Sequence, residues 1–346
     1  MIARTALFVL SALVFANTAA CGLLGGAEPS QPSRLDPRPV PTEESAAADD
    51  DVETDGLPHE EPLTGMNDPS AEEKQTNDPG ENDPAAPATP APACDLAKPF
   101  GALAALPFNT SGYETGGRMS ADELTITFAR KTGTGNMQPF VATRASKEEP
   151  WGAASVLSAL DSTGDDAYLT TTKDDLTGFF ASSRSGNLQI HRTTRASTAA
   201  AWGSIAVVSS IVSTSADDDP FLASNGRAIY FDSNRSGTWS IYRATIESDG
   251  TVGAPAVVTT GTNAVVTGDE LTMYFSRASG SQQEIRVAKR AAVTDAWGTS
   301  SIVTELSSVA DDRVTWISAD GCRAIVSSTR SGGAGSSDLY FASKPK

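Results

Sequence analysis

The sequence is poor in the residues that build metal centres and nucleophilic triads. Its 346 residues include three cysteines and two histidines. His59 lies in a proline-rich segment and His191 in a predicted strand, so neither a zinc site nor a Ser-His-Asp triad can be assembled from them. No glycine-rich loop with phosphate-binding spacing leads into a helix. We therefore predict that the protein is not an enzyme and requires no cofactor.

Positive charge is also scarce, with 26 basic side chains against 43 acidic ones. Most of the excess lies in residues 28–93, which hold 17 acidic residues, three basic residues and 13 of the 20 prolines. The rest of the chain is nearly neutral, so we expect no basic surface and no nucleic-acid partner. Because apolar residues are sparse and like charges keep the chain extended, residues 21–93 are predicted to be a disordered tether.

Apolar runs long enough to span a membrane are absent. A shorter apolar run, residues 6–16, follows Arg4 and precedes small residues that continue to Cys21. A positive charge, a short apolar stretch and small residues in this order are typical of an export signal. We predict that residues 1–20 are a signal peptide.

The residues around the predicted cleavage site, Thr18-Ala19-Ala20-Cys21-Gly22, resemble a bacterial lipobox, whose cysteine is acylated and becomes the mature N-terminus. The family usually has Leu where Thr18 stands, so ordinary cleavage after a small residue is the alternative. Both readings imply export. Gly22 in place of Asp is what the resemblance associates with sorting to the outer membrane of a Gram-negative cell.

Residues 95–346 contain a fivefold internal repeat. One marker is an aromatic or apolar residue followed by glycine, with copies spaced by 51, 51, 50 and 45 residues. A β-rich run follows each copy, and two further strand patterns also recur five times. The copies of the first marker begin at Phe100, Trp151, Trp202, Val252 and Trp297.

Each repeat holds four predicted antiparallel strands, and in the third copy Asn225-Gly226 and Ser236-Gly237 mark two tight hairpin turns. Radial repetition of four-stranded sheets predicts an all-β, five-bladed propeller over residues 94–346. The domain opens with a lone outer strand near Phe100 and ends on a third strand at residues 339–341. We therefore expect the N-terminal strand to complete the last blade, which removes open sheet edges.

The third copy carries Asp219-Pro220, Asn225-Gly226, Tyr230-Phe231, Arg235 and Ile241-Tyr242. This pattern resembles the TolB-type propeller repeat of exported bacterial proteins, with looser matches in the first and fourth copies. The resemblance implies a binding or scaffolding platform. We expect a monomeric protein-interaction module of the cell envelope, held at the membrane by its lipid, whose partner is an envelope protein. An exported propeller that binds or cleaves carbohydrate is the alternative.

Two charged sets are predicted to share one face of the propeller: acids at the starts of the innermost strands, and arginines in the turns between the second and third strands. They fit ion pairs between blades, a glycosidase carboxylate pair or a Ca²⁺ site. The fourth copy has Asn263 where an acid is expected. The acids are Glu114, Asp165, Asp166, Asp217, Asp218, Asp219, Asp311 and Asp312, and the arginines are Arg184, Arg235 and Arg330.

The two remaining cysteines, Cys94 and Cys322, are predicted to form a disulfide. Cys94 precedes the strand that should complete the last blade, and Cys322 lies in the first hairpin turn of that blade. Both positions fall on the face opposite the charged sets. An exported compartment is oxidising, so the bond can persist there.

Overall fold

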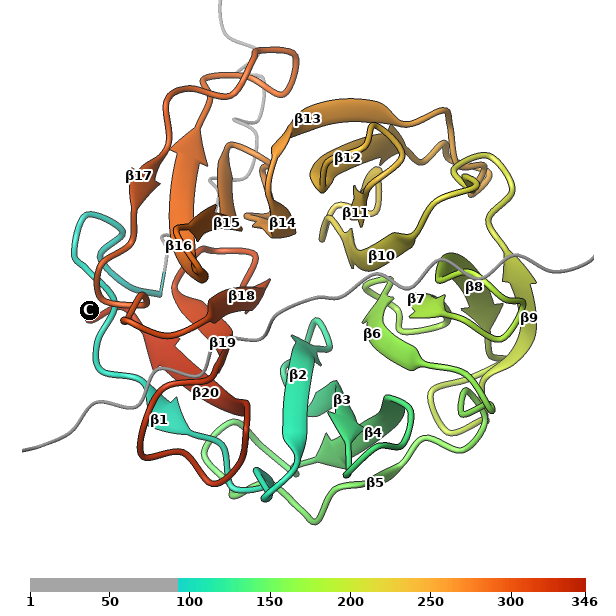
Figure 1. Cartoon of the computed structure of the whole chain (residues 1–346), viewed down its shortest axis with the longest axis horizontal. Helices are drawn as coiled ribbons and strands as arrows, with labels where there is room; N and C mark the ends of the chain where they lie inside the picture. The colour runs from blue at the N-terminus through green and yellow to red at the C-terminus, as the bar shows by residue number, and fades with distance from the viewer. Residues whose placement is uncertain (1–92) are drawn as a thin grey trace, which may run out of the picture. The chain divides into compact units, whose positions relative to one another are not determined.

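A computed structural model describes residues 93–346, which form a five-bladed β-propeller with no helix in that range (Figure 1). The predicted signal peptide, the acylation predicted at Cys21 and all but the last residue of the predicted tether lie outside the described residues. Within the described part of the chain, no helix could span a membrane.

Each blade is a four-stranded antiparallel sheet, and its strands are called A to D from the axis outwards (Figure 1). Blade 1 holds β2 (Tyr113–Met119), β3 (Thr125–Lys131), β4 (Gln138–Thr143) and β5 (Ser155–Val156), and blade 2 holds β6 (Asp166–Thr171), β7 (Thr177–Ser182), β8 (Gln189–Thr194) and β9 (Gly203–Val207). Blade 3 holds β10 (Asp217–Leu222), β11 (Ala228–Ser233), β12 (Ser240–Thr245) and β13 (Ala256–Thr260), and blade 4 holds β14 (Thr262–Val266), β15 (Thr272–Ser279), β16 (Gln282–Lys289) and β17 (Ser301–Ile302). Blade 5 holds β18 (Asp312–Ile317), β19 (Arg323–Ser328), β20 (Asp338–Ser343) and the N-terminal β1 (Ala104–Ala105).

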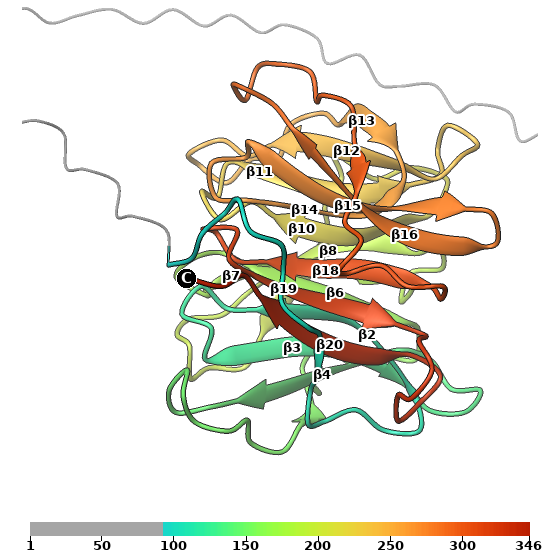
Figure 2. The ribbon, with the colours of Figure 1, turned by 90° about the vertical axis from the view of Figure 1, so that its left-hand side faces the viewer.

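The ring closes as predicted, because β1 pairs with β20 as the outermost strand of blade 5. Ala104 lies opposite Phe341 and Ala105 opposite Tyr340. The amide of Asp95 also donates to the carbonyl of Pro345 over 2.9 Å. Figure 2 accordingly shows the start of the described chain beside its C-terminus.

The A-to-B turns repeat one local hydrogen-bond pattern. In blade 2 the Thr172 hydroxyl donates to Asp174 Oδ1 over 2.6 Å, and the Leu176 amide donates to the same oxygen. An Asp side chain that binds backbone two residues on favours a tight turn. The same pattern recurs at Asp122, Asp269 and Asp320, so four blades share it.

Three tryptophans that follow the C strands stack against arginines of their own blades. The Arg144 guanidinium lies 4.4 Å from the Trp151 ring centroid, and Arg195–Trp202 and Arg290–Trp297 are equivalent at 4.3 and 4.2 Å. Each arginine also donates from Nε to a carbonyl of the preceding A-to-B turn. These tryptophans therefore join outer and inner parts of a blade.

Every A strand contains a bulge near its middle, which interrupts the register with strand B. In four blades the first bulged residue has a positive φ: Gly116 at 67°, Tyr168 at 61°, Asp219 at 48° and Asn263 at 56°. For Tyr and Asp this left-handed conformation carries strain, and bulges of this kind re-aim side chains next to binding sites.

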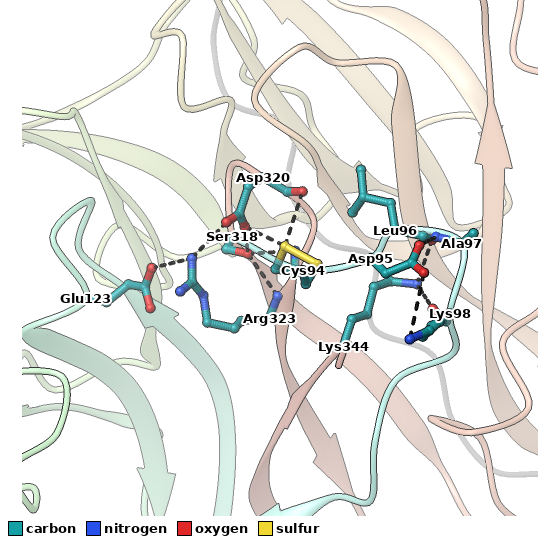
Figure 3. The surroundings of a disulfide bond; sticks show 11 residues. Cys94, Asp95, Leu96, Ala97, Lys98, Glu123, Ser318, Asp320, Arg323 and Lys344 are labelled. Atoms are coloured by element: carbon teal, nitrogen blue, oxygen red, sulfur yellow. Dashed lines mark hydrogen bonds and ion pairs between the residues drawn. A yellow bond between two sulfur atoms is a disulfide. The ribbon is translucent and has the colours of Figure 1, made fainter. Parts of the chain in front are cut away.

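The predicted disulfide is present and joins Cys94 to Cys322, with the two Cα atoms 5.7 Å apart (Figure 3). Cys322 immediately precedes strand β19, at the end of the A-to-B turn of blade 5, and both cysteines are buried. The bond therefore ties the start of the domain to its last blade, across a sequence separation of 228 residues.

Replacing both cysteines by alanine should lower the free energy of unfolding by about 4 to 5 kcal/mol, because the unfolded chain regains the entropy of a very long loop. Denaturant unfolding of wild-type and variant protein measures the difference. Wild-type protein unfolded in excess reductant serves as the control and should behave like the variant. Equal stability of oxidised and reduced wild type would contradict this account.

Candidate functional site

The predicted arginines bind three of the predicted acids, and each pair lies within one blade instead of between blades. The three acids are fully buried. Each also accepts a hydrogen bond from the serine that ends strand B. The pairs are Arg184–Asp166 at 2.8 Å, Arg235–Asp217 at 2.6 Å and Arg330–Asp312 at 2.7 Å. These charges clamp the start of strand A to the B-to-C turn.

Blades 1 and 4 depart from this clamp. In blade 1, Glu114 pairs at 2.8 Å with Arg130, an arginine inside strand B that the turn pattern did not indicate. In blade 4 the bulge follows Thr262, as it follows Asp218 in blade 3, so Gly261 stands at the acid position. Asn263 occupies the first bulged position, which Asp219 occupies in blade 3, so it stands where one of the predicted acids stands.

Two other predicted acids join neighbouring blades through backbone amides. Asp165 Oδ1 accepts from the Met137 amide of blade 1 over 2.8 Å, and Asp311 Oδ1 accepts from the Gln283 amide of blade 4 over 3.0 Å. Both are architectural contacts. The other two predicted acids, Asp218 and Asp219, take part in neither kind of contact and lie at the axis of the propeller.

Asp218 and Asp219 form an acidic cluster at the axis with Asp232 of strand B in the same blade. Asp232 lies directly opposite Asp218 in the β10–β11 pairing, and its Oδ2 accepts from the Asn263 amide over 2.8 Å. Asp219 accepts from Arg118 Nη2 of blade 1 and from the Asn263 side-chain amide of blade 4. Residues from three blades thus meet on one carboxylate.

The axial cluster holds polar atoms that lack partners in the described part of the chain. They are Asp232 Oδ1 and the Nε and Nη1 atoms of Arg118. Both side chains are 3% exposed. Burying a polar atom without a hydrogen-bond partner costs free energy of folding. These three atoms can still donate or accept hydrogen bonds.

Burial and mutual repulsion raise the pKa values of the cluster's carboxyls. Burial, with Asp219 as the next cause, raises the pKa of Asp218 to about 7. The same two causes raise the pKa of Asp232 well above its usual value. For Asp219 burial raises the pKa, and the Arg118 charge and the Asn263 hydrogen bond oppose that rise. An acid that titrates near neutral pH suits proton transfer.

Two tyrosines border the cluster. Burial, followed by the charges of Asp218 and Asp219, raises the pKa of Tyr168 well above its usual value. Its ring lies against Gly116, where an added Cβ would be 2.5 Å from the Tyr168 ring, so only glycine fits opposite it. Tyr113 accepts a hydrogen bond from Arg313 over 3.1 Å.

Sequence reasoning found two of the three aspartates but missed Asp232, Arg118 and Tyr168. Asp232 looks like one more polar residue in a strand, and Arg118 has no equivalent in the other copies. Only the bulge and the ring bring them together. No group of three His, Cys, Asp or Glu side chains among the described residues has the arrangement of a metal site.

A cavity of about 420 Å³ opens at the opposite face, where the A-to-B turns lie. The A strands of all five blades contribute to its walls. Its rim carries Lys147, which binds the buried Glu123 at 3.1 Å, and Arg323, which binds the same carboxylate at 3.0 Å. Figure 3 shows the pair of Arg323 and Glu123. Its largely apolar walls include Met119, Phe221, Leu222, Val266, Trp316 and Ile317.

These features define the protein as a closed five-bladed propeller with an axial carboxylate cluster and an apolar cavity on the opposite face. No family model and no curated protein sequence matches the chain. Solved structures do match in fold, and TolB propellers are among them, as the sequence pattern implied.

TolB from Acinetobacter baumannii is 15% identical with a TM-score of 0.41, and the match covers 68% of this chain and 55% of that one, about half of its length. The GH62 α-L-arabinofuranosidase domain of Coprinopsis cinerea is 10% identical, with 73% and 98% covered and a TM-score of 0.48. A gluconolactonase from Xanthomonas campestris is 16% identical, with 75% and 99% covered and a TM-score of 0.43.

These matches correct the expectation that the protein is not an enzyme. That expectation rested on missing histidines and phosphate loops. Paired carboxyl groups can cleave glycosidic bonds without a histidine or a phosphate loop, so those absences do not exclude catalysis. The glycoside hydrolases and the gluconolactonase match this chain in fold alone.

Replacing Asp218 by Asn should stabilise the protein at high pH. The carboxyl has a pKa of about 7 when folded against 3.8 as a free side chain, so wild-type stability falls as pH rises from 4 to 7. The stability advantage of Asp218→Asn should therefore grow over this interval to at most about 4 kcal/mol and stay constant above it. Urea unfolding at several pH values measures the difference.

The matched control is Asp174→Asn. Hydrogen bonds from Thr172 and Leu176 lower the Asp174 pKa, so this variant should lose stability relative to wild type as pH rises toward about 4, and the difference should stay constant above that pH. A pH-independent difference for Asp218→Asn would contradict the assignment.

Proposed function

We propose that this protein is a cell-envelope lipoprotein whose propeller binds an envelope protein partner through the 420 Å³ cavity. The lipobox-like residues around Cys21 support the anchored location. The observation that carries the proposal is the cavity itself, where apolar side chains from five blades meet inside a charged rim.

The composition of this cavity favours a protein partner. Trp316 and Phe221 offer flat apolar surface, and Met119 adapts to irregular shapes. A bulky apolar side chain of the partner would fill the cavity, while the Glu123 ion pairs exclude water around it. Centrally buried anchors with a polar rim are the usual arrangement at protein interfaces.

A photo-crosslinking residue placed at Ala319, an exposed position on the cavity wall, should capture one protein in intact cells. Adding Ser224→Trp, which fills the cavity from another exposed wall position, should reduce that adduct at least tenfold because the apolar anchor can no longer enter. Mass spectrometry of the adducts measures the loss.

Ser236→Trp, at an exposed turn that does not line the cavity, is the control and should leave the adduct unchanged. The proposal fails if Ser224→Trp has no effect on the adduct. It also fails if the partner crosslinks only through residues of the B-to-C turns.

Glycoside hydrolysis at the axial cluster is a second candidate. The observation that favours it is the combination of Asp218, whose pKa burial raises to about 7, with Asp219, whose raised pKa the Arg118 charge and the Asn263 hydrogen bond oppose. Two carboxyl groups whose environments give them different protonation states can divide the roles of acid and base or nucleophile. Asp218 is the partly exposed member of the pair.

Assays with a panel of aryl α- and β-glycosides test this candidate. Any activity should fall as pH rises above about 7, because Asp218 then loses the proton it donates, and Asp218→Asn should lower kcat at least a hundredfold. Asp174→Asn, at the opposite face, should keep full activity. If Asp218→Asn keeps its activity, the axial cluster is not the catalytic site.

A further inference from the structure

A cleft of about 730 Å³ lies between blades 3 and 4, away from both sites described above. Strand β13 forms one wall, and β15, β16 and the segment before β17 form the other. In Figure 1, β13 and β17 are the outermost strands of their blades, and β15 and β16 lie between β14 and β17. Val257 of β13 is 63% exposed in this cleft.

Four arginines line the cleft, and their charges are incompletely neutralised. Arg243 and Arg290 share the single carboxylate of Glu270, at 3.0 and 3.6 Å. Arg286 pairs with Glu284. Arg277 has no carboxylate within ion-pair distance among the described residues, and it donates only to Thr259 Oγ1 and the Thr260 carbonyl, both at 2.9 Å.

The departure of blade 4 from the repeat explains the free charge of Arg277. In blade 3, Asp217 and Ser233 occupy the two positions that Gly261 and Arg277 occupy in blade 4. Because the buried acid is missing, this guanidinium has no anion of its own and instead crosses to strand β13. The sole lining carboxylate, Asp295, already accepts the Ala292 amide over 3.0 Å.

The remaining lining groups suit a hydroxylated ligand. Thr294, Thr299, Ser300 and Trp297 also line the cleft. The Ser300 hydroxyl accepts from Arg286 Nε over 2.9 Å, and the Arg290 guanidinium stacks on the Trp297 indole. Hydroxyls can exchange hydrogen bonds with sugar hydroxyls, an aromatic ring packs on the apolar face of a pyranose, and a guanidinium binds a carboxylate through two parallel hydrogen bonds.

We propose that this cleft binds an acidic saccharide, with Arg277 pairing the sugar carboxylate. The site is independent of the apolar cavity and of the axial cluster. The ligand is a uronic-acid unit and not a neutral sugar, because the Arg277 charge that no carboxylate neutralises is what distinguishes this cleft.

Calorimetric titration of the full chain with a galacturonic acid trimer tests the proposal, and a neutral galactose trimer and acetate are the comparison ligands. The acidic trimer should bind at least tenfold more tightly than either. Arg277→Gln, which keeps hydrogen-bond donors but removes the charge, should weaken its binding at least tenfold. Val257→Trp, which fills the cleft from an exposed position, should abolish it.

Arg227→Gln is the control, since Arg227 is exposed, has no ion pair among the described residues and lies outside the cleft. It should bind like wild type. The proposal is overturned if the acidic trimer binds no more tightly than the neutral trimer or acetate, or if its binding survives both cleft variants. It is also overturned if the acidic trimer does not bind at millimolar concentration. None of these outcomes bears on the crosslinking test of the apolar cavity.

Discussion

Closure of the ring is the constraint on which the rest of the structure depends. The pairing of β1 with β20 is short, and the Cys94–Cys322 bond reinforces it at the face of the A-to-B turns. Only a closed ring holds five A strands around one axis. At this axis Arg118 of blade 1 binds Asp219 of blade 3, 101 residues away in sequence.

Within the closed ring, repeated and non-repeated residues have different roles. The buried acid–serine–arginine clamps of blades 2, 3 and 5 are nearly identical and satisfy their own charges. The candidate sites arise where copies differ: Asp219 and Tyr168 at equivalent bulges, or Arg277 in place of a serine. A charge that the repeat does not neutralise is available to a ligand.

The carboxylate cluster also has a stability cost. Asp218 and Asp232 face each other across two strands, and burial raises the pKa of both. At neutral pH the fold thus carries acids that favour protonation, next to a left-handed Asp219. Buried repulsion and backbone strain in one place are features that stable scaffolds retain mainly at functional positions.

The sequence by itself determined the five blades, the strand that closes the ring and the disulfide, because these follow from local patterns with a fixed period. Hairpin turns, alternating strands and the order of copies are all readable within about 50 residues. It also placed Asp218 and Asp219 among the candidate residues, without separating them from the acids that serve as clamps.

Tertiary structure alone decided which charges remain available. Every A strand has a bulge that shifts the register by one residue, and in blade 3 the first bulged residue, Asp219, binds Arg118 of blade 1. The apolar cavity combines one short wall from each of five blades. Such sites depend on contacts between residues far apart in sequence, which periodicity cannot reveal because it records only what the copies share.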